Sequence, residues 1–284
     1  MRSRSWLAVV LVSAAGAGYV APTNAKLAID PLLYPEPPRN AITFWGHACA
    51  YIDIGGFGIV TDPVFARRYA VIRRRLIAAP PRESFDQAEV VLISHAHQDH
   101  LNPKTLARFT PGTIVLCPRP AAKYVAGLGL RVLVMRPGDE FDFPGGTIVA
   151  VAAHHPGGRH SLKARSDGRA LGYIIRGPRN TIYYSGDTDY FPGIAAIGSK
   201  YRPDIALLNI NAHLHSEDAV FAIAGLGMPS VVPMHLGAYD GKSTRLGPRW
   251  RAELVGALGS TIVPLEVGES ISLSPSARDS AAHR

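Results

Sequence analysis

Four side chains that bind metals stand within one short segment of this chain. The segment SHAHQDHL contains His95, His97, Asp99 and His100 and follows directly on the apolar run EVVLIS. Buried imidazoles and carboxylates are costly without a compensating cation, so a packed core does not explain four of them together. Alternate residues of extended backbone point the same way, which lets His95 and His97 share one ion. Asp99 and His100 can then turn toward a second ion.

The same design, an apolar strand followed by a metal-binding side chain, recurs three more times. One apolar run ends before His154 and His155, another before Asp187 and a third before His235. A single histidine at such a place is usually an ordinary loop residue, but three such ends joined to the first cluster favour a metal site. Imidazole and carboxylate without thiolate suit zinc, with manganese or iron as alternatives.

Short strands make up most of the elements that must position these side chains. The apolar runs predict strands at 42–45, 50–54, 58–61, 89–94, 113–116, 131–135, 147–152, 171–176, 181–185, 205–209, 230–232 and 260–263. Helices are expected at 103–109 with Asn102 as its N-cap, at 119–126, at 216–224 and at 250–258. This alternation predicts an α/β (α+β) fold of two mixed sheets with helices outside. We expect one domain over 40–274 and a polar tail over 275–284.

The overall composition narrows the class of protein. The chain has 284 residues, of which 47% are hydrophobic, and only two cysteines, Cys49 and Cys117. These values exclude a disordered chain, a collagen-like repeat, a disulfide scaffold and a long coiled coil. The formal net charge of +8 leaves room for an anionic partner: nucleic acid, a membrane or a phosphate-bearing substrate. Two separate thiols are the simpler interpretation of the cysteines, with a disulfide as the alternative.

Residues 1–25 have the pattern of an export signal. Arg2 and Arg4 form a basic start, an apolar run follows to Val20, and small residues near Ala25 offer a cleavage site. The run is too short and too rich in glycine and alanine to favour a spanning helix, although an uncleaved anchor is the alternative. We therefore expect a periplasmic or secreted protein, which is exported by the general secretory route because a twin-arginine pair is missing.

The motifs together resemble those of the metallo-β-lactamase superfamily from about Ile42 to Leu273. The resemblance rests on the order of His-x-His-x-Asp-His, His155, Gly-Asp-Thr and His235. Further segments, GHA at 46–48, TDPVF at 61–65 and HPGGR at 155–159, resemble one subgroup. That subgroup contains N-acyl phosphatidylethanolamine phospholipase D and L-ascorbate-6-phosphate lactonase. Membership implies an αββα sandwich with two metal ions at the edge of the sheets.

The same resemblance implies a role for each motif residue. It divides the ligands into two groups that share one carboxylate: His95, His97 and His155 hold one ion, Asp99, His100 and His235 hold the other, and Asp187 bridges them. His155 is preferred to His154 because it precedes Pro-Gly-Gly-Arg. Asp62 and His47 are expected to support the ligand loops rather than bind metal, although Asp62 could instead be a turn residue before Pro63. Flavin-linked di-iron relatives have a glutamate where this chain has His97, which disfavours redox chemistry.

Two ions that share Asp187 would also share a water and lower its pKa, which gives a hydroxide nucleophile. Asp99, His213 and His215 are the candidate catalytic residues. The two histidines follow a predicted strand with alternate spacing and could serve as a general acid or orient the substrate; a supporting or surface role is the alternative. Such a site can hydrolyse phosphate diesters, esters, lactones or amides, so the reaction depends on the pocket.

Several basic residues are candidates for contact with substrate. Five arginines follow the Asp62 loop and could receive an anionic group or form a solvated basic segment: Arg67, Arg68, Arg73, Arg74 and Arg75. Arg159 and His160, just beyond His155, could contact substrate or be ordinary loop residues.

The sequence thus predicts an exported dinuclear metal-dependent hydrolase that acts on a phosphodiester such as a phospholipid. A lactonase or other ester or amide hydrolase, β-lactams included, is the enzymatic alternative. A metal- or lipid-binding protein without turnover is the other alternative, and the intact ligand set argues against it. Cleavage of nucleic acid is disfavoured because the positive charge lacks interleaved aromatic residues, whereas peripheral contact with a membrane stays open.

Overall fold

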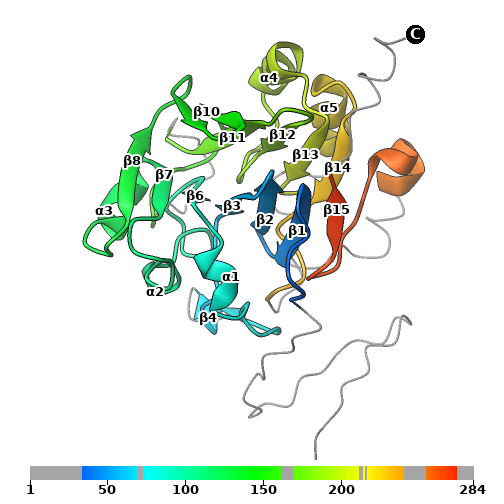
Figure 1. Cartoon of the computed structure of the whole chain (residues 1–284). Helices are drawn as coiled ribbons and strands as arrows, with labels where there is room; N and C mark the ends of the chain where they lie inside the picture. Colours follow the sequence, from blue (N-terminus) through cyan, green and yellow to red (C-terminus); the bar gives the residue numbers. More distant parts are fainter. Residues whose placement is uncertain are drawn as a thin grey trace, which may run out of the picture.

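The computed structural model describes residues 34–69, 73–160, 169–210, 214, 216–239 and 254–273. Within them, two β-sheets pack face to face (Figure 1). The first sheet has the strand order β15-β1-β2-β3-β6-β7-β8, and the second has the order β14-β13-β12-β11-β10-β9. The predicted export signal and the polar tail lie outside the described residues. Among those described, no helix is long and apolar enough to cross a membrane.

The strands are short, as the sequence predicts. The first sheet consists of β1 (Ala41–Gly46), β2 (Cys49–Ile54), β3 (Phe57–Thr61), β6 (Val90–Leu92), β7 (Ile114–Pro118), β8 (Arg131–Met135) and β15 (Ser270–Ser272). The second consists of β9 (Glu140–Phe143), β10 (Gly146–Ala152), β11 (Leu171–Arg176), β12 (Thr181–Tyr184), β13 (Ile205–Leu208) and β14 (Ser230–Pro233). A separate ribbon pairs β4 (Arg68–Tyr69) with β5 (Arg73–Arg74).

Helices cover both outer faces of the two sheets. They are α1 (Glu83–Asp86), α2 (Pro103–Leu106), α3 (Arg119–Val125), α4 (Gly193–Tyr201) and α5 (Ser216–Gly225), with the 3₁₀-helix η2 at Gly259–Thr261. The central apolar layer joins side chains of both sheets, for example Ile52 and Leu207. A second layer packs α1–α3 against the first sheet, and a third packs α4 and α5 against the second sheet. The αββα sandwich expected for the superfamily is therefore confirmed.

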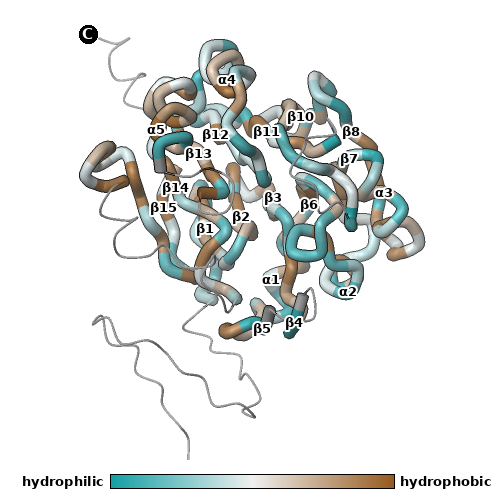
Figure 2. The backbone as a smooth tube through the Cα atoms, turned by 180° about the vertical axis from the view of Figure 1, so that it is seen from behind, coloured by the Kyte–Doolittle hydropathy of each residue, from teal (hydrophilic) through white to brown (hydrophobic). Residues whose placement is uncertain are grey.

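Burial on both faces explains why the central strands are almost continuously apolar rather than alternating. All residues of β1, β2, β6 and β13 are buried. Figure 2 shows hydrophobic residues along the strands in the middle of the molecule and many hydrophilic residues in the surrounding loops. Cys49 and Cys117 are free and buried in this core, so the two cysteines do not form a disulfide. Burial raises the pKa of Cys117 to about 12, which makes its thiol unreactive.

The sequence predicts the start of α2 correctly but mispredicts the structure near residue 260. Asn102 caps α2 as predicted, since its Oδ1 accepts a hydrogen bond from the Thr105 amide at 2.9 Å, although the helix is one turn long. The strand predicted at 260–263 is wrong: η2 begins there at Gly259, whose φ is +54°, and Ile262 makes only an isolated bridge to Val231. Residues 254–258 are helical, and 250–253 lie outside the described residues. The sequence did not predict β4, β5, β9, β15, α1 or α4.

Candidate metal centre

Five strands that precede candidate ligands point the same way within their sheets. In the first sheet, β1 and β3 both run antiparallel to β2, and β3 is parallel to β6. In the second, β10 and β12 both run antiparallel to β11, and β12, β13 and β14 are parallel. The carboxyl ends of β1, β6, β10, β12 and β14 therefore lie at one edge of each sheet, and their loops bring the candidate ligands together.

The first cluster contains His95, His97, His155 and Asp187, whose donor atoms all lie within 4.8 Å of one another. His97 Nδ1 is 2.9 Å from His95 Nε2 and 3.1 Å from His155 Nε2. Asp187 Oδ2 is 3.8 Å from His95 Nε2 and 3.9 Å from His155 Nε2. All are buried except His97, which is half-buried.

The second cluster contains His47, Asp99, His100 and His235, again with donor atoms within 4.8 Å of one another. Asp99 Oδ2 is 3.5 Å from His47 Nε2, 3.6 Å from His235 Nε2 and 3.9 Å from His100 Nε2. The Asp99 side chain is 21% exposed, whereas the three imidazoles are 8% exposed or less. Asp99 is therefore the side chain through which this cluster reaches solvent.

Asp187 contacts both clusters. Besides its contacts in the first cluster, its Oδ2 lies 3.1 Å from His100 Nε2 and its Oδ1 lies 3.7 Å from His235 Nε2. Asn209, which follows β13, donates a hydrogen bond from Nδ2 to Asp187 Oδ1 at 2.7 Å. Gly186 has φ +56°, and a Cβ at this position would collide with Ser94. Only glycine therefore lets the Asp187 loop approach the His95 loop this closely.

The donor atoms of each cluster are of types that fit a divalent metal ion. Each cluster offers four ligand atoms of the types that zinc and similar ions prefer, and neither contains a thiolate. His100 Nε2 is buried and makes no hydrogen bond within the described residues, although it faces the Asp187 carboxylate. A ring nitrogen in this situation is suited to bind a cation between the carboxylates.

Asp62, at the end of β3, organises the ligand loops from behind. Its Oδ2 accepts hydrogen bonds from His100 Nδ1 at 2.6 Å, Tyr184 Oη at 2.6 Å and Ser94 Oγ at 2.5 Å. Its Oδ1 accepts one from the Ser94 amide at 2.7 Å. The bond to Nδ1 leaves Nε2 of His100 as the metal-binding nitrogen. Asp62 therefore has the supporting geometry that the sequence predicts and is more than a turn residue.

Burial and neighbouring charges set the protonation of the ligands. Burial, and then the neighbouring imidazoles, lower the pKa of His95 well below its usual value. Burial, and then the neighbouring His235 ring, lower the pKa of His47 to about 3. Neutral imidazole is the form that binds metal. Burial alone would lower the pKa of His100, but the carboxylates of Asp187, Asp99 and Asp62 raise it well above its usual value. These carboxylates supply the negative charge that a cation between them would neutralise.

His47 differs from its predicted supporting role because its ring lies among the ligands. It follows β1 directly, so the strand-end pattern applies to it as well, and a bulge between Phe44 and Gly46 turns the chain there. His47 and His235 have φ +61° and +70°, a conformation that non-glycine residues rarely adopt. The His235 amide donates to His47 O at 2.6 Å, so the two strained residues hold each other in place.

The predicted site residues near His155 differ in how they relate to the clusters. His154 is exposed and its ring stacks on Phe191 at 6.0 Å, so the preference for His155 as a ligand agrees with the geometry. Arg159 Nη1 donates to the carbonyl oxygens of Ala96 at 3.3 Å and Leu101 at 3.0 Å, which braces the ligand segment. His160 is exposed. The candidate catalytic residues His213 and His215 lie outside the described residues, so their roles stay predictions.

The arginines after the Asp62 loop do not form one anion-binding group. Arg75 is 2% exposed and donates to Val64 O at 3.1 Å and Tyr34 Oη at 3.1 Å. Its guanidinium lies 4.8 Å from the Phe65 ring centre and 5.5 Å from that of Tyr239. The prediction that Arg75 receives an anion is therefore wrong, because its guanidinium is buried and both Nη1 and Nη2 donate inside the protein. Arg67 and Arg68 are exposed, Arg74 is half-buried, and the backbone of Arg73 and Arg74 forms β5.

We expect Arg75→Leu to lower the free energy of unfolding by about 2–3 kcal/mol, because it leaves buried carbonyl and hydroxyl groups without their donor. Urea unfolding of the purified protein measures this. Arg68→Leu in β4, from the same arginine-rich segment, is the matched control, and its exposed side chain predicts a change within about 0.5 kcal/mol. Equal effects of the two substitutions would contradict the structural role of Arg75.

Sequence reasoning missed two residues that shape the site. Asn209 follows an apolar strand just as the ligands do, so the strand-end pattern could have identified it. Tyr184 lies inside the buried run of β12, where a tyrosine is an ordinary core residue. Its contact with Asp62 comes from the facing of the two sheets, for which the sequence carries no local signal.

Comparisons with known proteins agree with this site. The sequence pattern described as "Beta-lactamase superfamily domain" matches residues 58–236. A metal-dependent hydrolase of Pyrococcus furiosus is 31% identical over 244 residues, which cover 82% of this chain and 99% of the relative. One of Thermoplasma volcanium is 29% identical over 234 residues, covering 82% and 98%. The crystal structure of an isothiocyanate hydrolase from Delia radicum gut bacteria superposes with a TM-score of 0.68 at 21% identity, covering 82% and 99%.

The chain belongs to the metallo-β-lactamase superfamily. It is a metal-dependent hydrolase of that superfamily.

Proposed function

We propose that this protein is an exported dinuclear hydrolase that cleaves a phosphodiester such as a phospholipid. The observation that carries the dinuclear proposal is the position of Asp187. Its carboxylate lies within 3.9 Å of imidazole nitrogens from both clusters, as a bridging ligand must. His95, His97 and His155 would hold one ion, and Asp99, His100 and His235 the other, with His47 as a further donor.

Bound at these clusters, two divalent ions would supply a hydroxide nucleophile at neutral pH and polarise the bond that is cleaved. The protein contributes orientation and negative charge. Asp62 and Asn209 fix the His100 ring and the Asp187 carboxylate by hydrogen bonds. Burial alone would raise the pKa of Asp99, but His100, His235 and His47 lower it well below its usual value, so its partly exposed carboxylate stays ionised and can bind a cation or accept a hydrogen bond from water.

An aromatic rim beside the ligand loops supports a substrate with apolar chains. The rim consists of Tyr190, Phe191 and Phe221. Tyr190 is 40% exposed and Phe221 is 59% exposed, with ring centres 6.0 Å apart. The segment before Tyr190 is bonded to the ligand loop, since the Asp189 amide donates to His154 O at 3.1 Å. Exposed aromatic groups at the edge of a site favour contact with lipid chains or a membrane surface.

Hydrolysis of bis(p-nitrophenyl) phosphate by the metal-reconstituted protein tests the reaction class. We expect turnover of this diester to exceed turnover of simple lactones and carboxylic esters, because two cations stabilise both oxygens of a phosphoryl displacement. Metal analysis of the same preparation gives the number of ions. Lactone turnover without diester turnover would replace the phosphodiester proposal by a lactonase. Two bound ions without any turnover would indicate a binding protein instead.

Export rests on the pattern of residues 1–25 and is tested separately. We expect the full-length protein, expressed with its own start, to appear in the periplasmic or culture fraction with a new N-terminus near residue 26. N-terminal sequencing and fractionation measure this. A matched variant, with both Arg2 and Arg4 replaced by glutamate, should stay in the cytoplasm because the basic start of the signal is removed. An intact N-terminus in the cytoplasmic fraction would contradict export.

A further inference from the structure

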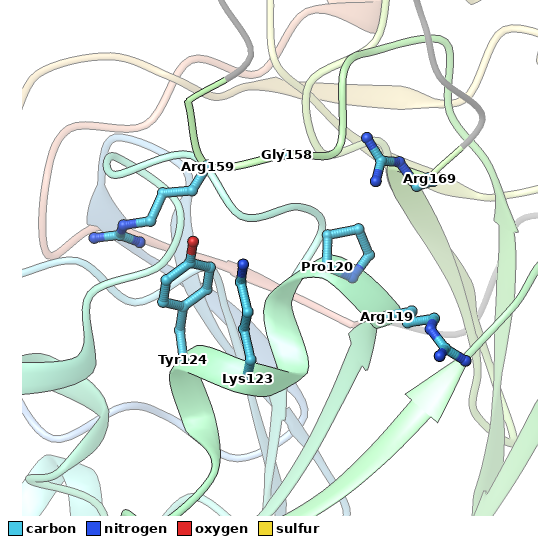
Figure 3. Close-up of a pocket in the computed structure, with 7 residues that line it drawn as sticks. All are labelled: Arg119, Pro120, Lys123, Tyr124, Gly158, Arg159 and Arg169. Carbon is cyan, nitrogen blue, oxygen red and sulfur yellow. The ribbon is translucent and has the colours of Figure 1, made fainter.

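We infer that a basic cavity between α3 and the loop after His155 binds a phosphate group of the substrate, apart from the metal clusters. The cavity has a volume of about 300 Å³ (Figure 3). Its walls come from the start and middle of α3 and from both sides of the loop: Arg119, Pro120, Lys123, Tyr124, Gly158, Arg159 and Arg169. This volume suits a group as large as a sugar phosphate or a lipid head group.

The charge of the cavity is the first argument. Four of its seven lining residues are cationic and none is acidic. Arg119 and Lys123 are exposed, and neither has an ion pair within the part of the chain that the structure describes. In Figure 3 the Lys123 ammonium and the Tyr124 hydroxyl lie side by side and face the segment Gly158–Arg159. Cations with an adjacent hydroxyl donor are the combination that recognises phosphate oxygens.

The second argument is the connection of the cavity to the metal centre. Gly158 and Arg159 belong to the loop that begins with the ligand His155. Arg159 donates to the carbonyl oxygens of Ala96, between His95 and His97, and of Leu101, directly after His100. The Arg159 guanidinium also lies 4.8 Å from the Tyr124 ring centre. Arg159 therefore ties one wall of the cavity to the metal-binding segment.

Two other candidates for an anion site, the arginine Arg75 and a second cavity, fit an anion less well. Arg75 is buried, and its Nη1 and Nη2 donate to Val64, Tyr34 and Ala78 inside the protein. A second cavity, of about 420 Å³, contains Asp86, Glu89 and Asp142 in its lining and no cationic side chain. An anion would be repelled there. The cavity beside α3 is therefore the candidate that combines volume, positive charge and a connection to the ligand loop.

The cavity limits which substrates the enzyme can bind at two points. Resting on the proposed function, the inference is that the substrate carries a phosphate besides the scissile bond, and that this phosphate lies in the cavity while the scissile bond lies at the metal centre. A substrate bound at two points is oriented before it reacts, which favours one scissile bond over others.

Amide NMR titration of the full-length protein with inorganic phosphate and with glycerol 3-phosphate tests the site. We expect the amides of Lys123 and Gly158 to shift. Combining Arg119→Gln with Lys123→Gln should raise the dissociation constant about tenfold, because two of the four cations that line this partly exposed cavity are lost. The matched control combines Lys200→Gln with Arg136→Gln. Lys200 lies 4.9 Å from the Tyr201 ring centre, as Lys123 lies 5.0 Å from that of Tyr124, and the control should bind phosphate like the wild type.

His97→Ala separates the cavity from the metal centre. This variant should lose turnover and keep the shifts at Lys123 and Gly158. Unchanged affinity in the cavity variant, or shifts confined to residues 95–100, would overturn the inference. Failure of the diester assay while the titration behaves as expected would remove the proposed reaction and leave the cavity assignment standing.

Sedimentation with phosphatidylcholine vesicles, with and without phosphatidic acid, identifies the source of the phosphate. Binding that requires phosphatidic acid and is lost in the cavity variant assigns the site to a lipid phosphate. Phosphate binding in solution without vesicle binding assigns it to a water-soluble ester. Vesicle binding that the cavity variant retains would contradict a role of the cavity in lipid recognition.

Discussion

Combining His95→Ala with His97→Ala should reduce the bound metal from two ions per chain to one and lower kcat/KM by about 10³-fold, because one ion contributes several kcal/mol to the transition state. The substitutions remove two of the four donors of the first cluster. They leave the second cluster of His47, Asp99, His100 and His235 complete. Metal analysis after dialysis, with kinetics on a phosphodiester, measures both effects.

The reciprocal variant makes this test specific. Combining Asp99→Ala with His235→Ala removes two donors of the second cluster and should also leave one ion per chain. Combining all four substitutions should leave none. His154→Ala is the matched control, since His154 adjoins a ligand but is exposed, and it should keep both ions. Loss of both ions from either double variant would show that the two clusters form a single site.

The clustering of the side chains that the sequence singles out has a physical reason. His95, His97, Asp99 and His100 are neighbours in one short segment, so their proximity is independent of the rest of the fold. The remaining ligands all follow apolar strands, and strands that point the same way end at the same edge of a sheet. His47 follows this rule as well. Its predicted supporting role came from resemblance alone, and the bulge in β1 that turns its ring toward Asp99 carries no sequence signal.

Features that depend on packing between distant segments could not be predicted in this way. Arg75 stands in a run of arginines that resembles a solvated basic segment. Its burial depends on the rings of Phe65 and Tyr239, and Tyr239 is far away in sequence. Similarly, the cavity beside α3 exists because Lys123 on that helix and Arg159 in the loop after His155 meet across two separate segments of the chain. A charge pattern along the chain cannot tell an arginine that becomes buried, such as Arg75, from a cation that lines a cavity, such as Lys123. Both are simply basic residues in the sequence.

Asp62→Asn should lower the affinity of the second cluster for metal by about 10- to 100-fold, as loss of a carboxylate behind a ligating histidine usually does. The carbonyl oxygen of the introduced side chain can still accept from the Ser94 amide, but its amide nitrogen cannot accept from His100 Nδ1 or Tyr184 Oη. The His100 ring then loses the bond that presents its Nε2 to the ion. Competition with a chromophoric chelator measures the affinity of each ion separately.

Asp53→Asn separates this effect from a general loss of stability. Asp53 is also buried, and its Oδ1 accepts from the amides of Asn40 and Gly56, away from the metal centre. Both variants replace a buried carboxylate that accepts hydrogen bonds by a neutral amide, which accepts weaker ones, so both should unfold at lower urea concentration than the wild type. Only Asp62→Asn should weaken metal binding, because only Asp62 contacts a ligand ring. Equal metal affinities in the two variants would mean that His100 is oriented by the packing of its loop and that the carboxylate behind it contributes stability alone.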